Sequence, residues 1–286
     1  MNKNNYITCR LEGRTGNLMF EVANALNQSL LYKRELVIPR FEDRLTHLES
    51  TLFRKIEKWI DSLDEISESK EYEGSFEFHK VPPPDNNIPT IYSGYYQSEK
   101  FFEESREQIK NLFSPPSNFF EKVYNEYPFF KNEIVVGVNI RRGDYLKVSS
   151  RHPVVSLDYI KGAFKYLPKH DKILVMSDDV DWCKENIKLP NVVFSDNSKF
   201  WDEYGIWLLS MCHHFIISNS TFSWWGAWLS DYKNKVVIAP STWFGPNIEY
   251  KSADIYCNDW IKIPTEYKDG RIVPIQSNDI KYKSII

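Results

Sequence analysis

Short apolar segments alternate with helical segments across residues 134–239, and this alternation restricts the chain to a small group of folds. The predicted strands are residues 134–140, 172–177, 191–194, 215–218 and 236–239, and the predicted helices are residues 156–167, 180–187, 200–212 and 222–231. Short apolar strands connected by helices form parallel sheets that are covered on both faces. We therefore predict an α/β fold, in which ligands bind beyond the carboxyl ends of the strands.

The first part of the chain starts in the same way but continues less regularly. Residues 6–11 are predicted as a strand, residues 18–33 as a helix with Asn17 as its N-cap, and residues 36–39 as a second strand. Further along, residues 90–97 are predicted as a strand and residues 98–113 as a helix. We place a boundary near residue 133, which gives an N-terminal α/β domain of residues 1–133 and a Rossmann-like domain of residues 134–286.

Overall charge and cysteine content exclude several classes of protein. Thirty-six basic and 39 acidic residues leave a net charge of −3, so the charge gives no reason to expect nucleic acid or an anionic membrane as a partner. The four cysteines are far apart and form neither a CxxC pair nor a Cys/His cluster, which argues against structural zinc and a disulfide scaffold. Because no apolar stretch resembles a signal peptide or a membrane helix, we expect a cytoplasmic location, with peripheral attachment to the membrane's inner face as an option.

Two arginines and an aspartate follow the first strand of the second domain, in the stretch VVGVNIRRGDYL. An arginine binds two phosphate oxygens through its planar fork, and it keeps its charge at any physiological pH. Asp144 could hold the guanidinium of Arg141 or Arg142 in place. The alternative is a salt bridge between strands with no ligand.

A second candidate anion site is the stretch SNSTFSWWGAWL, which joins a later strand to a helix. Ser220, Thr221 and Ser223 lie at the predicted helix start, where free backbone N–H groups and the helix dipole attract anions. Simple N-capping by Ser220 is the alternative. The tryptophans that crowd the same turn are explained either by this site or by core packing.

Two further stretches contribute polar groups. In SDDVD, Asp179 and Asp181 form a D-x-D pair of the kind that binds a divalent metal, whereas Asp178 or Asp179 could instead accept N–H bonds from a guanine base. We favour the base, because the arginines neutralise a diphosphate without a metal. In GRTGN, two glycines allow close backbone approach and place Arg14 and Asn17 where they could reach a ligand. This turn lacks the spacing of a dinucleotide fingerprint and of a P-loop.

Together these segments resemble the α-1,2-fucosyltransferase family, glycosyltransferase family 11. The resemblance is carried by GRTGNLMFEVANAL, VGVNIRRGDYL, SDDVDWCK, SNSTFSWWGAWLS and PSTWFG, in this order over residues 13–245. It implies a GT-B fold, with two Rossmann-like domains whose parallel sheets face a central cleft. It also implies GDP-L-fucose as donor, a galactoside as acceptor, inversion at the anomeric carbon, and no cofactor or required metal.

The resemblance also implies roles for individual residues. Arg141 would contact the donor diphosphate with support from Arg142 and Asp144, and Asn17 would point at the bond that breaks. Asn139 stands where the family usually has histidine, so it can form hydrogen bonds to the base but cannot carry a charge. The predicted catalytic residues are Arg141, Asn17 and Asp144, and the predicted donor-binding residues are Arg14, Gly16, Asn139, Arg142, Asp178, Asp179, Ser220, Thr221, Phe222 and Ser223.

The sequence does not single out the group that takes the proton of the acceptor hydroxyl. Glu21, Asp144 and His152 are the candidates. Two other functions remain open at this point. One is a metal-dependent transferase with a different nucleotide sugar, using Asp179 and Asp181. The other is a carbohydrate-binding protein without catalytic activity, whose tryptophan faces stack on sugars.

Overall fold

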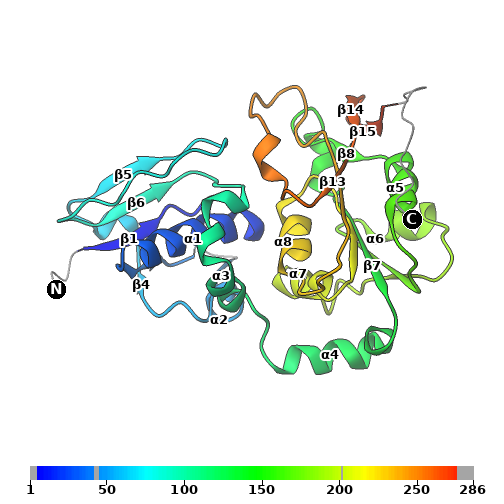
Figure 1. Ribbon diagram of the computed structural model, residues 1–286, viewed down its shortest axis with the longest axis horizontal. Helices are drawn as coiled ribbons and strands as arrows, with labels where there is room; N and C mark the ends of the chain where they lie inside the picture. The colour runs from blue at the N-terminus through cyan, green and yellow to red at the C-terminus, as the bar shows by residue number, and fades with distance from the viewer. Residues whose placement is uncertain (1–4, 42–44, 201, 276–286) are drawn as a thin grey trace.

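The computed structural model describes residues 5–41, 45–200 and 202–275. Two α/β halves lie side by side, the N-terminal half in blue and cyan and the C-terminal half in green to red (Figure 1). Helix α4 (Asn118–Glu126) leads from one half into the other. The predicted boundary at residue 133 falls between α4 and the first strand of the C-terminal half.

The C-terminal half contains a six-stranded parallel sheet in the order β10-β9-β7-β11-β12-β13. Its strands are β7 (Val135–Ile140), β9 (Lys172–Ser177), β10 (Val192–Phe194), β11 (His214–Ile216), β12 (Val237–Pro240) and β13 (Ile261–Ile263). Numbered along the chain this is the order 3-2-1-4-5-6 of a Rossmann fold. All six residues of β7 are buried, as expected for a central parallel strand covered on both faces.

Four helices cover this sheet: α5 (Leu157–Ala163), α6 (Val180–Asn186), α7 (Glu203–Ser210) and α8 (Thr221–Leu229). The same half contains a separate small mixed sheet, made of β8 (Val154–Val155), β14 (Thr265–Lys268) and β15 (Arg271–Pro274). The predicted strands and helices of this half are confirmed to within a few residues, whereas β8, β13, β14 and β15 were not predicted.

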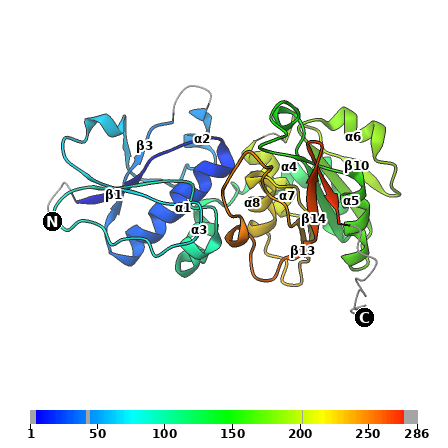
Figure 2. The same ribbon diagram turned by 90° about the horizontal axis from the view of Figure 1, so that it is seen from above.

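The N-terminal half has a four-stranded parallel sheet in the order β2-β1-β6-β5. It comprises β1 (Tyr6–Cys9), β2 (Glu35–Leu36), β5 (Lys70–Glu73) and β6 (Thr90–Ser93), with β3 (Ile38–Pro39) and β4 (Trp59–Ile60) paired separately. Its helices are α1 (Thr15–Leu31), α2 (His47–Ser50) and α3 (Arg106–Leu112). Figure 2 shows from above how α1 runs from this half toward α8.

Several elements predicted for this half differ in detail. The strand predicted at residues 90–97 ends at Ser93, because Gly94 and Tyr96 adopt positive φ angles of 121° and 46° and turn the chain. The helix predicted at residues 98–113 starts as two separate 3₁₀ turns and becomes α-helical only at Arg106. The strand predicted at residues 36–39 is split between two sheets.

A shared aromatic core holds the two halves together. The ring centre of Phe20, on α1, lies 4.5 Å from the ring centre of Trp224 and 4.8 Å from that of Trp225, both on α8. Phe102 stacks on Trp225 at 5.6 Å, and the rings of Trp224, Trp225 and Trp228 are at most 1% exposed. Core packing therefore explains the tryptophan-rich segment, and these rings do not form a surface for stacking sugars.

Candidate active site

Most of the predicted site residues lie at the carboxyl ends of three neighbouring strands of the six-stranded sheet. Strand β7 pairs with β9 on one side and with β11 on the other. The chain order reverses between β7 and β11, which makes this the switch point where α/β sheets bind ligands. Arg141 follows β7, Asp178 follows β9, and Ser220 follows β11.

Two carboxylates hold the guanidinium of Arg141. Its Nη2 lies 2.7 Å from Asp144 Oδ1 and its Nη1 lies 3.1 Å from Asp178 Oδ2. The side chain is 16% exposed, so the charge is fixed in direction and only partly screened by water. The predicted support of this arginine by Asp144 is present, and its remaining N–H groups can donate to an anion.

Arg142 points away from Arg141 and toward α6. Its Nε bonds Asp179 Oδ2 at 3.0 Å, and its Cζ lies 3.7 Å from the centre of the Trp182 ring. This contact is a cation–π interaction. Sequence reasoning missed Trp182, although its position in the first turn after Asp179 was a usable signal.

The aspartates after β9 are engaged within the protein. Asp178 Oδ1 accepts the backbone N–H of Arg142 at 2.8 Å, in addition to the ion pair with Arg141. Asp179 is the N-cap of α6 and accepts the N–H of Trp182. These contacts fix the positions of Arg141 and Arg142. The predicted contact of either aspartate with guanosine stays a prediction.

Asn139 connects the three central strands near their carboxyl ends. Its Nδ2 donates to the carbonyl of Met176 at 3.4 Å, and its Oδ1 accepts the hydroxyl of Ser218 at 3.0 Å. The residue is 7% exposed. An uncharged amide satisfies both partners here, which gives a structural reason for asparagine at this position.

Tyr145 connects Arg141 to the segment that leads into α8, because its ring centre lies 5.4 Å from Arg141 Cζ and its hydroxyl donates to the carbonyl of Asn219 at 3.2 Å. The backbone N–H groups at the start of this helix are not capped by Ser220. Ser220 is the N-cap residue, yet its side chain forms no capping hydrogen bond, so the alternative of simple capping is wrong. The Ser223 hydroxyl is fully buried and donates to the carbonyls of Ser218 and Ser220. Only the backbone of Ser223 could contribute to a donor site. The Phe222 ring lies against Gly205 of α7.

Helix α1 starts at Thr15 with Arg14 as N-cap, so the predicted start at residue 18 and the predicted capping by Asn17 are wrong. Asn17 lies inside the first turn, and its Oδ1 accepts hydrogen bonds from Gln97 at 3.0 Å and from Thr221 at 3.1 Å. The Thr221 contact links the starts of α1 and α8. We call this meeting point the junction.

Gly16 allows the two helix starts to approach each other. A Cβ atom at this position would lie 2.5 Å from Thr221 Oγ1 and 2.8 Å from the Thr221 carbonyl carbon. The Gly16 carbonyl also accepts the indole N–H of Trp225 at 2.9 Å. The close approach to Thr221 requires a residue without a side chain, since a clash with backbone cannot be relieved by a rotamer change.

Arg14 adds another contact across the junction. Its Nη2 lies 3.1 Å from Asp144 Oδ2, and the two side chains are 58% and 41% exposed. An ion pair this exposed adds little to stability. Its consequence is geometric, because both oxygens of Asp144 are now paired with arginines, one from each half.

The three candidates for the proton acceptor lie in different surroundings. Glu21 is 1% exposed and accepts the backbone N–H of Glu12, and burial raises its pKa well above the ordinary value. Asp144 is occupied by two arginines. His152 lies partly buried against Tyr145, with its pKa lowered by burial and by Arg151.

A group of side chains able to ligate a metal lies beside the start of α1, where the Thr15 hydroxyl donates to Asp202. Within the described ranges, one group of three such side chains lies close enough together to share an ion, and it consists of His47, Asp202 and Glu203. The D-x-D pair is not part of it: Asp181 is 87% exposed and pairs with Lys184.

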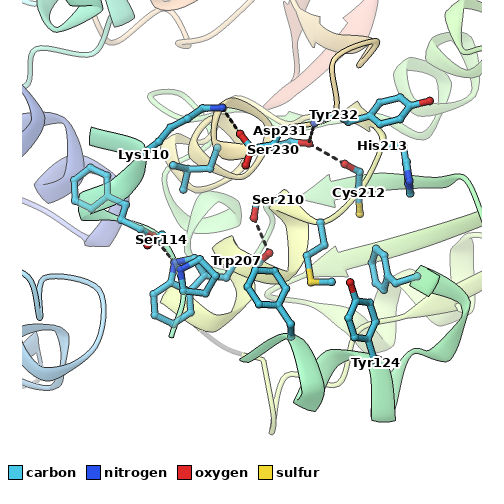
Figure 3. Close-up of a pocket in the computed structure, with 16 residues that line it drawn as sticks. Lys110, Ser114, Tyr124, Trp207, Ser210, Cys212, His213, Ser230, Asp231 and Tyr232 are labelled. Carbon is cyan, nitrogen blue, oxygen red and sulfur yellow. Dashed lines mark hydrogen bonds and ion pairs between the residues drawn. The ribbon is translucent and has the colours of Figure 1, made fainter. Parts of the chain in front are cut away.

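A cavity of about 450 Å³ lies away from the predicted site residues, between α4 and the ends of α7 and α8 (Figure 3). It is lined by residues such as Lys110, Trp207 and Tyr232, and none of the predicted site residues lines it.

Comparison with known proteins identifies the family. The model of glycosyl transferase family 11 matches residues 1–264. The chain belongs to this family. No helix among the described residues is long and apolar enough to cross a membrane.

Similar proteins include an α-1,2-colitosyltransferase from Escherichia coli, 36% identical over 60% of this chain and 62% of its own length. The O-antigen biosynthesis glycosyltransferase WbnK, from the same species, is 32% identical over 59% of each chain. A galactoside α-(1,2)-fucosyltransferase 1 from Alouatta belzebul is 26% identical over 77% of this chain and 64% of its own. Each match thus spans only about three fifths of the relative's length.

A solved structure with a similar fold is an α-1,6-fucosyltransferase, NodZ, soaked with GDP-fucose. It has a TM-score of 0.51 and 14% identity, and the match covers 80% of this chain and 93% of that one. The expected GT-B fold, with parallel sheets in both halves, is confirmed.

Proposed function

We propose that this family 11 enzyme transfers L-fucose from GDP-L-fucose to a sugar hydroxyl, with inversion at the anomeric carbon and without a metal. The proposed acceptor atom is O2 of a terminal galactose, in the synthesis of a glycan or surface polysaccharide. The α-1,2 linkage named for two of the similar proteins supports this choice.

One observation carries the proposal. Arg141 and the uncapped start of α8 follow the two strands at the switch point of the sheet and are linked through Tyr145. Arg14 and Asn17 of the other half contact Asp144 and Thr221 there. Cleavage of a nucleotide-sugar bond leaves growing negative charge on the diphosphate. Preorganised N–H groups stabilise such charge strongly in a site partly shielded from water.

A second donor sugar has specific support. A relative with 36% identity is named for transfer of colitose. A nucleotide-activated colitose is therefore the alternative donor to GDP-L-fucose. Incubation with either donor and a panel of galactosides, followed by NMR of the product, tests both choices. An α-1,2-fucosylated galactoside is the expected product, and a product formed only from the colitose donor would replace fucose by colitose.

The same assay addresses the two other functions. Turnover that continues in excess chelator excludes a metal-dependent transferase. Absence of turnover with any nucleotide sugar, together with binding of free sugars, would favour a carbohydrate-binding protein. The burial of the α8 tryptophans argues against the latter.

A further inference from the structure

Aromatic rings form a continuous series of contacts that starts at Arg141. The Cζ of Arg141 lies 5.4 Å from the centre of the Tyr145 ring, and Tyr145 stacks on His152 at 5.0 Å with 24° between the rings. His152 in turn contacts Phe244 at 5.9 Å. The series therefore leads outward from the proposed phosphate site.

The outer end of this series is a group of three rings, Phe76, Phe244 and Tyr250, which we call the ring wall. Phe76 lies 5.1 Å from Phe244 and stacks on Tyr250 at 5.2 Å with 4° between the rings. Phe76 comes from the N-terminal half, whereas the other two rings come from the segment after β12, orange in Figure 1. The wall thus bridges both halves, and Tyr250 is 53% exposed.

Backbone hydrogen bonds hold the wall beside His152. The N–H of Gly245 donates to the carbonyl of Arg151 at 2.9 Å, and the N–H of Asn247 donates to that of Ser150 at 3.1 Å. A Cβ at Gly245 would lie 2.3 Å from the Ser150 carbonyl oxygen, so the two segments are in close contact.

Polar and charged groups accompany these rings. Tyr95 is partly buried, and burial followed by the carboxylates of Glu12 and Glu21 raises the pKa of its phenol. Tyr250 and Arg151 also lie within electrostatic range of that phenol. An exposed ring that carries a hydroxyl and has charged groups in its neighbourhood suits a sugar, which has an apolar face and a polar rim.

We propose, building on fucosyl transfer as the function, that the ring wall binds the acceptor sugar and that His152 takes the proton of its reacting hydroxyl. In this step the O–H bond breaks as its proton moves to a ring nitrogen of His152. The freed oxygen electron pair forms the bond to the anomeric carbon, and the pair of the breaking C–O bond leaves with GDP.

His152 suits this role better than the other two candidates. Both oxygens of Asp144 are paired with arginines, and Glu21 is enclosed. Within the described part of the chain, by contrast, neither ring nitrogen of His152 forms a hydrogen bond. Arg151, Arg141, Asp144 and Tyr145 face the imidazole; burial and the arginines lower its pKa, and Asp144 opposes this shift. A neutral imidazole at pH 7 can accept a proton.

The first test replaces Tyr250 by alanine and uses lactose as the acceptor. Loss of one stacked ring should raise the KM for lactose about five- to tenfold, while GDP affinity by calorimetry stays unchanged. Tyr32→Ala removes a similarly exposed ring, 42% accessible, on the N-terminal half and should change neither value. An unchanged KM for lactose in Tyr250→Ala would overturn the acceptor site.

The second test measures the pH profile of His152→Gln. The kcat should fall about 10²-fold, and the acid limb of the wild-type profile, below the ordinary histidine pKa, should disappear. A normal GDP affinity in this variant would show that the donor site is intact. A kcat within threefold of wild type, or an unchanged acid limb, would overturn the role of His152. If the wild type transfers no fucose at all, the proposed function fails, whereas fucose transfer with normal variants refutes only this inference.

Discussion

The two sides of the candidate site are built in different ways. On the strand-end side, Arg141, Arg142, Asp178 and Asp179 hold one another through ion pairs, and their side chains are between 9% and 30% exposed. On the outer side, the ring wall stands on irregular segments, and the ring of Tyr250 is 53% exposed. A charged group held in one direction suits a donor diphosphate that is the same in every reaction. Rings on loops can change without disturbing the sheet, which suits a variable acceptor.

This difference predicts that substitutions at the strand ends affect every acceptor alike, whereas substitutions in the ring wall change acceptor preference. The following experiments test that division, starting with the largest expected effect.

Arg141→Ala should have the strongest effect. Loss of one preorganised donor to the leaving diphosphate should lower kcat by ~10²–10³ with every acceptor. Fucosyl transfer to several galactosides, measured alongside thermal unfolding, checks this. Arg40→Ala serves as the control, because Arg40 pairs with Glu49 and belongs to no predicted site. Near-normal turnover in Arg141→Ala would show that this arginine has no role in the mechanism. A loss of activity with only one acceptor would contradict the expected difference between strand-end and ring-wall substitutions.

Gly16→Ala tests the junction. The added Cβ clashes with Thr221 and should separate the starts of α1 and α8, and a misplacement on the order of 1 Å can lower the rate about 10²-fold. Gly162→Ala is the matched control, because a Cβ at that helical position meets nothing within 4 Å. The control should be more stable than wild type by about 0.5–1 kcal/mol, with unchanged kinetics. Equal activity in both variants would show that the close approach of the helices has no role in catalysis.

Asp181→Asn should have the smallest effect. Its carboxylate is 87% exposed and pairs with Lys184 across one helical turn, so turnover should stay within about twofold of wild type, with or without chelator. A large loss that added manganese restores would instead support the metal-dependent reading of the D-x-D pair.

Much of the C-terminal half could be predicted because its strands are buried on both faces. Such strands appear in the sequence as uninterrupted apolar segments. The ends of these segments mark the positions of Arg141, Arg142 and the SNSTF stretch in the fold. The start of α1 could not be predicted, because tertiary contacts of Gly16 and Asn17 with Thr221 decide it. Asn17 before Leu18 has the local pattern of a cap, yet its amide oxygen bonds to side chains far away in the sequence.

Individual side-chain directions were also beyond the sequence. Ser223 is a residue type common at anion sites, but its hydroxyl points into the protein and donates to the carbonyls of Ser218 and Ser220. The ring wall depends on segments that meet only in the folded chain. The charged residues Arg141, Arg142, Asp178 and Asp179 were predictable because they follow directly on strand ends, whereas the ring wall was not because its members lie within irregular segments of both halves.

Calorimetric titration of GDP and of guanosine into wild type and Arg141→Ala tests the central claim most directly. If Arg141 and the start of α8 hold the diphosphate, the wild type binds GDP far more tightly than guanosine, and Arg141→Ala loses most of that difference while its guanosine affinity stays the same. Equal affinity of the wild type for the two ligands, or a preference for GDP that survives in Arg141→Ala, would contradict the account.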